Sequence, residues 1–466
     1  MRRAHDDTPH PLTLGNCISW GRGASTLSAS AQKKVVHGVQ NDSRIVRPGE
    51  VFVAIVTDKD DGHRYVSAAF EKGAAAAIVD KHAVIECSLH NRKKLIKVAS
   101  PLASIQRIAA YYRRELGCLI IGITGSSGKT TTRHFIATVL GAVYPIGETR
   151  SNWNNHLGVP MSLLSFAGDE WAGVIEMGAN HQGEISVLSK IAAPDIAVIT
   201  NIGYAHVGLF GSLGKTTAAK FEIIDGLNTK GGFLLANGDD ARVVAAAKKS
   251  GATTIFFGCS RRCSIRAENI RFFAETGLEF EVDGFAFRLS VPGRHFLYSA
   301  LPAIFLGRRC GIPDEIIAKA LTRLKPVTMR GVITKKKKVA FILDCYNANP
   351  SSMKTAVEQL IEIAPAHRRV AVVGDMLELG RYAPRLHREV GVLLAQNKVK
   401  KIIAVGQFST DVAKGAMKAG VDPNSIVTVE TAEAAAASLR CLTVAGDTVL
   451  LKGSRGVHLE KVYETF

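Results

Sequence analysis

The stretch Leu119 to Thr132 reads L-I-I-G-I-T-G-S-S-G-K-T-T-T, an apolar run followed by a Gly/Ser turn that leads directly into Lys129 and Thr130. The β-branched run predicts a short buried strand, and the turn predicts that a helix begins immediately after it. Such a turn points backbone N–H groups and the positive end of the helix at one place, which suits a phosphate chain. Lys129 would add a positive charge near the β and γ phosphates, and Thr130 would offer a hydroxyl to Mg²⁺. The stretch therefore predicts a P-loop.

The loop departs from the strict pattern at one position. G-x-x-x-x-G-K-T requires glycine at 123, where Ile123 stands, and Gly122 comes one residue early. The alternative is an ordinary strand-to-helix turn, but strand, loop and helix patterns all agree with a P-loop. The motif predicts a bound nucleotide and leaves the reaction open. The predicted nucleotide-binding residues are Gly125, Ser126, Ser127, Gly128, Lys129, Thr130 and Thr131.

Length and composition indicate a multidomain protein without membrane segments. A chain of 466 residues, 47% of them hydrophobic, accommodates about three domains at roughly 150 residues each. Met1 to Gly23 has no apolar signal-peptide core, and no later segment holds 18 apolar residues in a row, so no stable membrane insertion is expected. The eight cysteines are scattered without a C-x-x-C pair, which favours a reducing cytoplasm over disulfides. Cys259 and Cys263 stand close together, but no second pair accompanies them, so zinc is not expected.

The net charge of +18, from 59 basic and 41 acidic residues, could indicate a nucleic-acid-binding protein. The basic residues are spread along the whole chain, however, and no nucleic-acid-binding motif is present. The one dense run, Lys335 to Lys338, lies between two strand-like segments and predicts a solvated hairpin tip. We therefore expect general attraction of anionic small substrates and no nucleic-acid partner.

The order of predicted elements gives an α/β protein of three domains. Residues 1–115 predict a smaller mixed α/β domain, 116–326 a central P-loop domain with a parallel sheet, and 327–466 a C-terminal Rossmann-like domain. Ligands bind at the carboxyl ends of the strands in such sheets, and polar residues follow the predicted strands there. Two domains with polar strand ends also predict a cleft between them. The polar residues at strand ends include Glu176, Asn201 to His206, Asn237 and Asp344.

A second stretch, Gly208 to Thr217, repeats the G-x5-G-K-T-T spacing of residues 122–131. It lies several residues beyond its strand, so Lys215 does not follow a strand end. We interpret this stretch as the start of a helix that carries Lys220 and Glu222.

Eight motifs along the chain resemble those of the Mur ligases. The similarity extends from Asp42 to Lys461, and Y-N-A-N-P together with G-D-M-L-E-L-G is its most specific part. Within the family, the chain is most similar to the members that add D-alanyl-D-alanine to a UDP-N-acetylmuramoyl tripeptide. The motifs are T-G-S-S-G-K-T-T (124–131), S-N-W-N-N-H-L-G-V-P (151–160), E-M-G-A-N (176–180), N-I-G-Y-A-H (201–206), A-K-F-E-I (219–223), D-C-Y-N-A-N-P (344–350), G-D-M-L-E-L-G (374–380) and K-G-S-R (452–455).

The resemblance implies an ATP-dependent amide synthesis in the bacterial cytoplasm by a monomer that needs Mg²⁺. ATP would phosphorylate the terminal carboxylate of the tripeptide, and the amine of D-alanyl-D-alanine would attack the acyl phosphate. It also implies that Glu176 and His206 are metal ligands beside Thr130, and that Lys220 becomes a further ligand when carbamylated. Without the resemblance, a buried or surface role for His206 and an exposed, ion-paired Lys220 would be the simpler interpretations.

The resemblance assigns further residues to ATP and to the substrates. Asn237 would contact adenine, and Arg330 and Asp344 would reach ATP when the C-terminal domain closes. Y-N-A-N-P alone would be only a polar turn. The residues that the resemblance places at the substrates are Ser43, Arg44, Asp61, His63, Asn154 and Asn155 for the UDP-sugar and its extension, and Tyr346, Asn347 and Asn349 after closure.

Two departures from the family pattern are present. The usual G-x-H-N-x-x-N is Gly293-Arg-His-Phe-Leu-Tyr-Ser299, so Phe296 and Ser299 replace both asparagines while His295 remains. His156 stands where an acidic residue is common. Both departures concern positions expected near the nucleotide or the substrate.

The sequence leaves two alternatives open. One is another Mur-type ligase, such as the one that adds the third residue, although its usual D-N-P-R motif is missing from the chain. The other is a P-loop ATPase unrelated to the cell wall. The third residue of the tripeptide is not indicated by the sequence.

Overall fold

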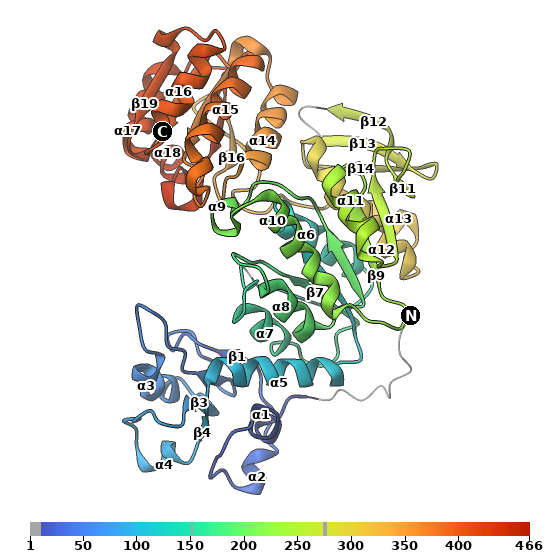
Figure 1. Cartoon of the computed structure of the whole chain (residues 1–466), viewed down its shortest axis with the longest axis vertical. Helices are drawn as coiled ribbons and strands as arrows, with labels where there is room; N and C mark the ends of the chain where they lie inside the picture. Colours follow the sequence, from blue (N-terminus) through green and yellow to red (C-terminus); the bar gives the residue numbers. More distant parts are fainter. Residues whose placement is uncertain (1–10, 151, 274–276) are drawn as a thin grey trace.

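The computed structural model describes residues 11–150, 152–273 and 277–466. Residues 1–10 of the amino-terminal segment and Ser151, the first residue of one quoted motif, lie outside this description. Figure 1 shows an elongated molecule with the first part of the chain at one end, the P-loop part in the middle and the last part at the other end. Within the described ranges, no helix has the length and apolar character needed to cross a membrane.

The first part of the chain forms a parallel sheet of order β1-β2-β3-β4, which confirms the mixed α/β prediction. Strand β2 (Val51–Val53) is buried throughout because both faces of the sheet are covered. The long helix α5 leads from this sheet into the P-loop strand (Figure 1). The elements are α1 (Leu14–Gly21), α2 (Ala29–Gln32), β1 (Val39–Gln40), β2 (Val51–Val53), η1 (Gly62–Tyr65), α3 (Val66–Glu71), β3 (Ala76–Asp80), α4 (Leu89–Arg92), β4 (Leu95–Val98) and α5 (Pro101–Glu115).

The central part forms a parallel sheet of order β11-β10-β9-β8-β5-β7-β6. The P-loop strand β5 lies between β8 and β7, where the strand order reverses, so its carboxyl end is the expected ligand position. The elements are β5 (Leu119–Thr124), α6 (Lys129–Leu140), β6 (Ile146–Glu148), α7 (Gly158–Leu163), β7 (Ala172–Glu176), α8 (Glu184–Ala192), β8 (Ile196–Ile199), α9 (Val207–Phe210), α10 (Leu213–Phe221), η2 (Glu222–Gly226), β9 (Phe233–Asn237), α11 (Ala241–Ser250), β10 (Thr254–Gly258), β11 (Ile265–Arg266), η3 (Arg294–Phe296), α12 (Leu297–Arg309) and α13 (Asp314–Thr322).

A small antiparallel sheet, which the sequence did not predict, follows the parallel one. It consists of β12 (Glu268–Phe273), β13 (Gly277–Val282) and β14 (Phe285–Leu289). Strand β12 is mostly exposed at the edge, so it lacks the apolar run that identifies a buried strand. The short strands β6 and β11 were missed for a similar reason, because each has at most three residues.

The last part of the chain forms a sheet of order β15-β16-β20-β17-β18-β19, parallel except for β15. Strand β20, the last in sequence, is inserted between β16 and β17, and Lys452 ends it. The elements are β15 (Val332–Lys336), β16 (Val339–Asp344), α14 (Pro350–Ile363), η4 (Ala366–Arg368), β17 (Arg369–Gly374), η5 (Gly380–Tyr382), α15 (Ala383–Gln396), β18 (Lys401–Val405), α16 (Ser409–Lys418), η6 (Pro423–Ser425), β19 (Ile426–Val429), α17 (Ala432–Leu442), β20 (Thr448–Lys452), η7 (Arg455–Val457) and α18 (Glu460–Thr465).

The basic run at residues 335–338 forms the predicted hairpin turn between β15 and β16. Two of its lysines are not simply solvated. The Lys336 ammonium donates to the Tyr463 carbonyl at 2.9 Å, and that of Lys337 to a terminal oxygen of Phe466 at 2.7 Å. Cations stabilise the carboxyl end of a helix, so this turn also holds the end of α18.

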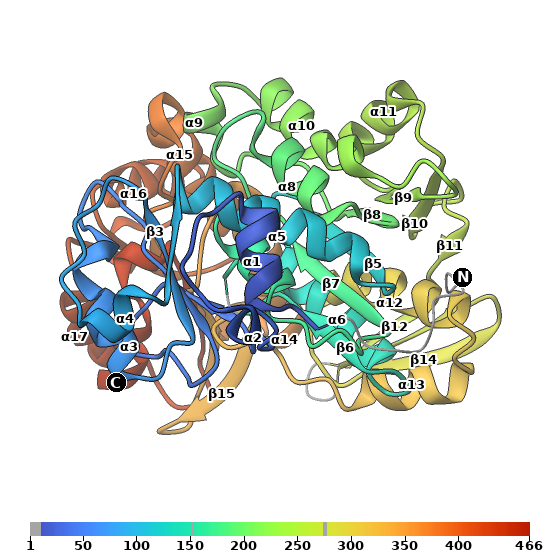
Figure 2. The same cartoon turned by 90° about the horizontal axis from the view of Figure 1, so that it is seen from below.

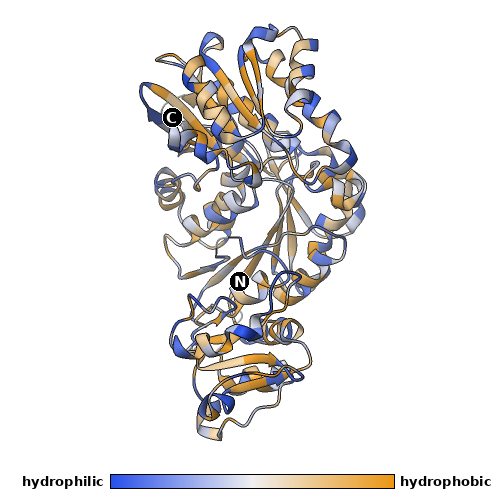
Figure 3. Cartoon of the chain, turned by 90° about the vertical axis from the view of Figure 1, so that its left-hand side faces the viewer, coloured by the Kyte–Doolittle hydropathy of each residue, from blue (hydrophilic) through white to orange (hydrophobic). Residues whose placement is uncertain are grey.

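The hydrophobic cores lie between the sheets and their helices, as the apolar strands in Figure 3 show. One core is continuous from the first part of the chain, through Ile105 and Ile108 on α5, into the central sheet. Figure 2 shows α5 beside the central helix α8, in agreement with this continuity. A second core, in the last part of the chain, includes Val207 from the central part, so the parts share packed side chains.

Candidate functional site

The P-loop has the predicted strand, turn and helix. Gly125 and Gly128 adopt φ values of 147° and 79°, which favour glycine. A side chain at Gly125 would also collide with the Thr200 hydroxyl. Helix α6 begins at Lys129, whose ammonium donates to the Gly125 carbonyl at 2.9 Å. The loop is therefore shaped to bring a helix end and a lysine to one point.

The position that departs from the strict P-loop pattern belongs to the strand and not to the turn. Ile123 is fully buried in β5, where it pairs with Glu176 of β7 and Val198 of β8. Because no tight turn occurs there, glycine is not required, and the isoleucine side chain adds to the core.

The P-loop is braced by the segment after β8. The Ser126 and Ser127 amides donate to the carbonyl and side-chain oxygens of Asn201, both at 2.9 Å. The Thr200 hydroxyl donates to the Ser127 carbonyl at 2.6 Å. The polar residues predicted after this strand therefore include direct supports of the loop.

Glu176 lies at the carboxyl end of β7 and is 2% exposed. Its two carboxylate oxygens accept hydrogen bonds from the Thr130 hydroxyl and the Asn154 amide, each at 2.9 Å. The Arg133 guanidinium lies 3.9 Å from the same carboxylate, and the Thr149 hydroxyl accepts from the Glu176 amide at 2.9 Å. Thr130 and Glu176, predicted as neighbours at a metal site, are thus brought together with Asn154, which was predicted at the substrate.

His206 is held by the C-terminal part of the chain. Its Nδ1 forms an ion-pair contact with the Glu378 carboxylate, and its backbone has a φ of 55°. Hydrogen bonding to His206 lowers the pKa of Glu378. Among the residues that the structure describes, no three His, Cys, Asp or Glu side chains are grouped to hold a metal ion. The role of His206 as a metal ligand stays a prediction.

Lys220 lies on α10 and is 1% exposed, so the interpretation as an exposed, ion-paired lysine is wrong. Its ammonium lies 5.4 Å from the centre of the Phe210 ring. Burial, with repulsion from Lys129, lowers the pKa of Lys220 to about 7, while Glu184 and Glu222 act in the opposite direction. Lys220 therefore has a substantial neutral fraction near neutral pH.

The repeated spacing at residues 208–217 forms no second P-loop. Helix α9 ends at Phe210, and α10 begins at Leu213 with the Ser212 hydroxyl accepting from the Lys215 amide. Residues 213–217 of this stretch begin the Lys220 helix as interpreted, whereas residues 208–210 belong to the separate helix α9. The helix ends at Phe221, so Glu222 lies just beyond it and accepts from the Gly183 amide at 2.7 Å.

The three residues expected near ATP have structural partners. The Asn237 amide donates to the Thr200 carbonyl at 2.9 Å, and its oxygen accepts from the Asp239 amide. The Arg330 guanidinium lies 4.3 Å from the centre of the Tyr346 ring. Asp344 pairs with Lys452 at 2.8 Å, and burial raises the pKa of this carboxyl group although Lys452 opposes the shift.

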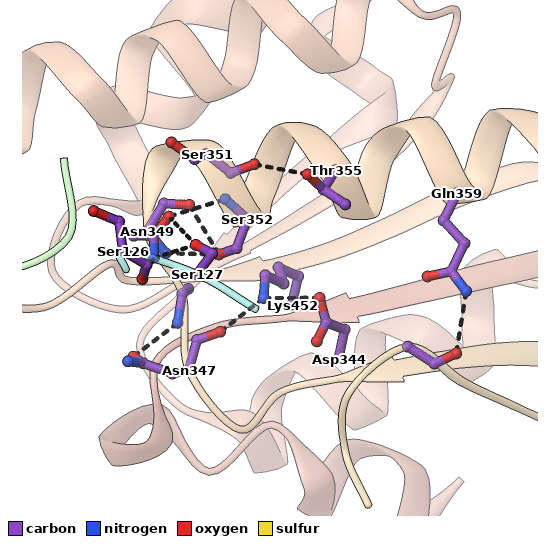
Figure 4. A network of polar contacts seen from close by, with 12 residues as sticks. Ser126, Ser127, Asp344, Asn347, Asn349, Ser351, Ser352, Thr355, Gln359 and Lys452 are labelled. Carbon is purple, nitrogen blue, oxygen red and sulfur yellow. Dashed lines mark hydrogen bonds and ion pairs between the residues drawn. The ribbon is translucent and has the colours of Figure 1, made fainter. Parts of the chain in front are cut away.

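The C-terminal part contacts the P-loop through Asn349 (Figure 4). Its side-chain amide donates to the Ser127 hydroxyl at 3.0 Å and to the Ser126 carbonyl at 3.4 Å. The Asn349 side-chain oxygen also caps helix α14. Lys452, at the end of β20, donates to the Asn347 carbonyl at 2.7 Å. The strand ends of the two larger parallel sheets therefore meet at the P-loop.

The residues predicted to bind the UDP-sugar lie in the first part of the chain, far along the sequence from the P-loop. Ser43 is buried, while Arg44 is exposed and pairs with Asp42 at 2.7 Å. Asp61 accepts from His63 Nδ1 at 2.7 Å, and His63 Nε2 accepts from the Asp80 amide at 3.0 Å.

Asn154 and Asn155 separate into different environments. Asn154 contacts Glu176 as described, whereas the Asn155 oxygen accepts from the Leu157 and Gly158 amides at the start of α7. The neighbouring His156 is exposed. The structure thus brings one of the two asparagines to the carboxylate site.

The two substitutions in the G-x-H-N-x-x-N region have packing partners. Phe296 is 2% exposed and its ring centre lies 6.0 Å from that of Phe135 on α6. The Ser299 hydroxyl lies 3.0 Å from that of Thr132 on the same helix. Burial and Lys452 lower the pKa of His295 to about 4. The departures therefore attach α12 to the P-loop helix.

Three residues at the site were not predicted from the sequence. Arg133 approaches Glu176, Lys452 pairs with Asp344, and Glu378 contacts His206. Lys452 lies in the motif K-G-S-R and Glu378 in the motif G-D-M-L-E-L-G. Their presence in these family motifs was the sequence signal that could have identified them. Arg133 had no signal beyond its place one turn into the P-loop helix.

Family models match three consecutive regions of the chain. Residues 35–113 match the "Mur ligase family, catalytic domain", residues 123–307 the "Mur ligase middle domain" and residues 329–455 the "Mur ligase, glutamate ligase domain". Together they cover most of the chain.

Relatives and solved structures agree with these matches. The chain is 33% identical to the UDP-N-acetylmuramoyl-tripeptide--D-alanyl-D-alanine ligase of Bacillus subtilis (strain 168), over 92% of this chain and 93% of that protein. A crystal structure of MurF from Acinetobacter baumannii matches with a TM-score of 0.84 at 29% identity, covering 98% of each chain. A structure of MurF ligase from Thermotoga maritima in complex with ADP matches with a TM-score of 0.80 at 28% identity, covering 94% of this chain and 98% of that one.

Proposed function

This chain belongs to the Mur ligase family, and from that membership we propose that it is the ATP-dependent ligase that adds D-alanyl-D-alanine to a UDP-N-acetylmuramoyl tripeptide. The reaction forms an amide bond in peptidoglycan precursor synthesis and yields ADP and phosphate. The observation that carries the proposal is the contact of Asn349 with Ser127, because it joins a nucleotide loop to the part of the chain expected to hold the second substrate.

The residues at the P-loop suit the activation of a carboxylate. ATP supplies the phosphoryl group that makes the terminal carboxylate of the tripeptide an acyl phosphate, and Mg²⁺ supplies positive charge to the phosphates. Lys129 adds a positive charge at the helix end. Because negative charge on the phosphates is spread over several oxygens, Lys129 and Arg330 would stabilise it from two parts of the chain.

The donor set around Thr130 fits Mg²⁺. Glu176 offers a buried carboxylate and Thr130 a hydroxyl, and their oxygens lie 2.9 Å apart. Magnesium prefers such oxygen ligands and usually completes its shell with water and phosphate, so a group of three protein side chains is not needed in advance. We propose Thr130, Glu176 and His206 as the residues that hold the metal.

Lys220 would join this set after carbamylation. Its neutral Nζ attacks the carbon of CO₂, forming an N–C bond, one C=O electron pair moves to oxygen, and Nζ releases a proton to solvent. The product is an anionic oxygen donor in place of an ammonium group. Burial of Lys220 supports this proposal because the lowered pKa leaves a neutral amine available.

We further propose that three successive parts of the chain bind different substrates. Residues 1–115 would bind the UDP-sugar through Ser43, Arg44, Asp61 and His63, residues 116–326 would bind ATP, and residues 327–466 would bind the incoming dipeptide and close on ATP. Use of ATP and of a nucleotide-linked precursor supports the bacterial cytoplasm as the location.

A phosphate-release assay tests the function. Purified protein with ATP, Mg²⁺ and UDP-N-acetylmuramoyl tripeptide is expected to release phosphate when D-alanyl-D-alanine is added, with one amide product per phosphate by mass spectrometry. Parallel reactions with tripeptides ending in diaminopimelate, lysine or ornithine identify the third residue. If the rate of phosphate release is the same with and without D-alanyl-D-alanine, the proposal is contradicted and an unrelated ATPase is favoured.

A further inference from the structure

The segment from Tyr204 to Gly211 belongs to the central part of the chain but is packed into the C-terminal part. Val207 is fully buried in the same hydrophobic core as Met376 and Leu379. Figure 1 shows α9, which begins at Val207, beside the C-terminal helices. The position of this segment is therefore set by both parts of the chain.

The segment is also hydrogen bonded to the loop formed by residues 378–382. The Gly208 amide donates to the Glu378 carbonyl at 2.9 Å, and the Tyr382 hydroxyl donates to the Gly211 carbonyl at 3.0 Å. Gly211 directly follows α9, and the Lys220 helix begins two residues later. One loop of the C-terminal part thus holds the chain between His206 and the helix that carries Lys220.

Close approach of the two backbones depends on Gly208. A Cβ atom at this position would lie 2.5 Å from the Gly380 nitrogen and 2.7 Å from the Glu378 carbonyl oxygen. Both are backbone atoms, so they cannot turn aside as a flexible side chain would. Any residue other than glycine at 208 would separate the segment from the loop.

The same loop also brings the Glu378 carboxylate into contact with the His206 ring. Nδ1 of His206 contacts the Glu378 carboxylate. With its hydrogen on Nδ1, the nitrogen that faces Glu378, the His206 ring would keep a free lone pair on Nε2. Metal-binding histidines very commonly have this arrangement, in which the carboxylate orients the ring and increases its basicity.

We infer that Glu378 is a positioning residue that orients His206 across the boundary between the two parts, so that the metal site is complete only when the C-terminal part is docked. The inference rests on the proposed function, which makes His206 a metal ligand. This positioning role would account for the contact between Glu378, in the motif G-D-M-L-E-L-G, and His206, in the motif N-I-G-Y-A-H. The contact makes metal binding dependent on closure.

Metal binding by the full chain tests the role of the carboxylate. Mn²⁺ binding is measured by electron paramagnetic resonance with adenosine 5′-(β,γ-imido)triphosphate present. Glu378→Ala is expected to weaken one Mn²⁺ site about 10- to 100-fold, the usual range for loss of such a partner. Glu378→Gln retains an acceptor and is expected to lose less. Glu389→Ala removes an exposed carboxylate of the same C-terminal part and is expected to match the wild type.

The tautomer of His206 gives a readout that loss of packing would not produce. In metal-free protein labelled with ¹⁵N-histidine, the signal missing in His206→Gln identifies this ring. It is expected to show hydrogen on Nδ1 in the wild type and to lose that preference in Glu378→Ala.

Hydrogen exchange tests the dependence on docking. Gly208→Ala is expected to raise exchange at residues 204–211, because its methyl group would collide with the loop backbone. Gly214→Ala is the matched control, since a Cβ there meets only the Ser212 hydroxyl at 3.9 Å. Gly208→Ala is also expected to weaken the same Mn²⁺ site as Glu378→Ala.

The outcomes separate this inference from the proposed function. If the wild type binds Mn²⁺ and catalyses ligation, and Glu378→Ala binds Mn²⁺ as tightly as the wild type, the inference is overturned while the proposed function stands. Unaltered exchange in Gly208→Ala would also overturn it. A wild-type chain that binds no Mn²⁺ in the presence of the nucleotide would overturn both.

Discussion

Lys220 illustrates how burial changes the chemistry of one residue. An exposed lysine is protonated at neutral pH, but this side chain is 1% exposed and its pKa falls to about 7. The neutral fraction therefore increases as the pH rises through 7. Only the neutral amine can react with CO₂, so carbamylation should follow this titration.

We predict that the protein incubated with ¹³C-bicarbonate gives a carbamate signal in the ¹³C nuclear magnetic resonance spectrum. The signal should be strong near pH 8 and should fade below about pH 7, because protonation removes the nucleophile. Lys220→Arg should lack it, since arginine stays protonated. Lys215→Arg, on the same helix, is the control and should retain the signal. If the carbamate signal persists in Lys220→Arg, Lys220 is not the site of carbamylation.

At the scale of elements, the P-loop helix α6 depends on its packing against α12. Phe296, the residue just before α12, stacks on Phe135 of α6, and Ser299 of α12 contacts Thr132 of α6. The two asparagines usual in G-x-H-N-x-x-N are thus replaced by Phe296 and Ser299, whose side chains contact the P-loop helix. This exchange favours packing over side-chain polarity at those positions.

Phe296→Asn is therefore expected to destabilise the protein although it restores a residue common in the family. Removing the ring leaves a cavity and buries an amide, at a cost of about 3–5 kcal/mol in the free energy of unfolding. Chemical denaturation monitored by circular dichroism measures the change. Phe273→Asn is the control, because Phe273 is 41% exposed and its loss should cost less than about 1 kcal/mol. Equal losses in both variants would contradict the packing role.

At the scale of the whole molecule, the central and C-terminal parts are coupled through shared contacts. Asn349 reaches the P-loop, and Val207 fills the C-terminal core. Each contact joins segments more than 100 residues apart. The docked arrangement thus depends on a small apolar anchor and a few hydrogen bonds.

Val207→Asp is expected to undock the C-terminal part, because an unpaired carboxylate would be buried in an apolar core. Small-angle X-ray scattering should show a larger radius of gyration, and thermal unfolding should separate into more than one transition. Leu209→Asp places the same charge two residues away on a side chain that is 42% exposed, and it should leave the scattering unchanged. An unchanged scattering profile for Val207→Asp would show that Val207 is not needed for docking.

Local patterns were enough to predict the P-loop, the parallel strands and the polar residues at their ends. Strand β5 and helix α6 arise from side chains close together in sequence, and glycines 125 and 128 from a local backbone requirement. Periodicity and turn chemistry act over such short distances, so the sequence states them directly. The exposed edge strand β12 was missed because its pattern lacks a buried face.

The contacts between parts were decided only by the tertiary structure. Glu378 and His206, Lys452 and Asp344, and Asn349 and Ser127 are each separated by more than 100 residues, and the first and third pairs join different sheets. Whether such groups meet depends on how the sheets are oriented after their cores have packed, which no local pattern specifies. By itself the sequence therefore determined the nucleotide loop and its family, whereas docking of the C-terminal part decided which side chains surround it.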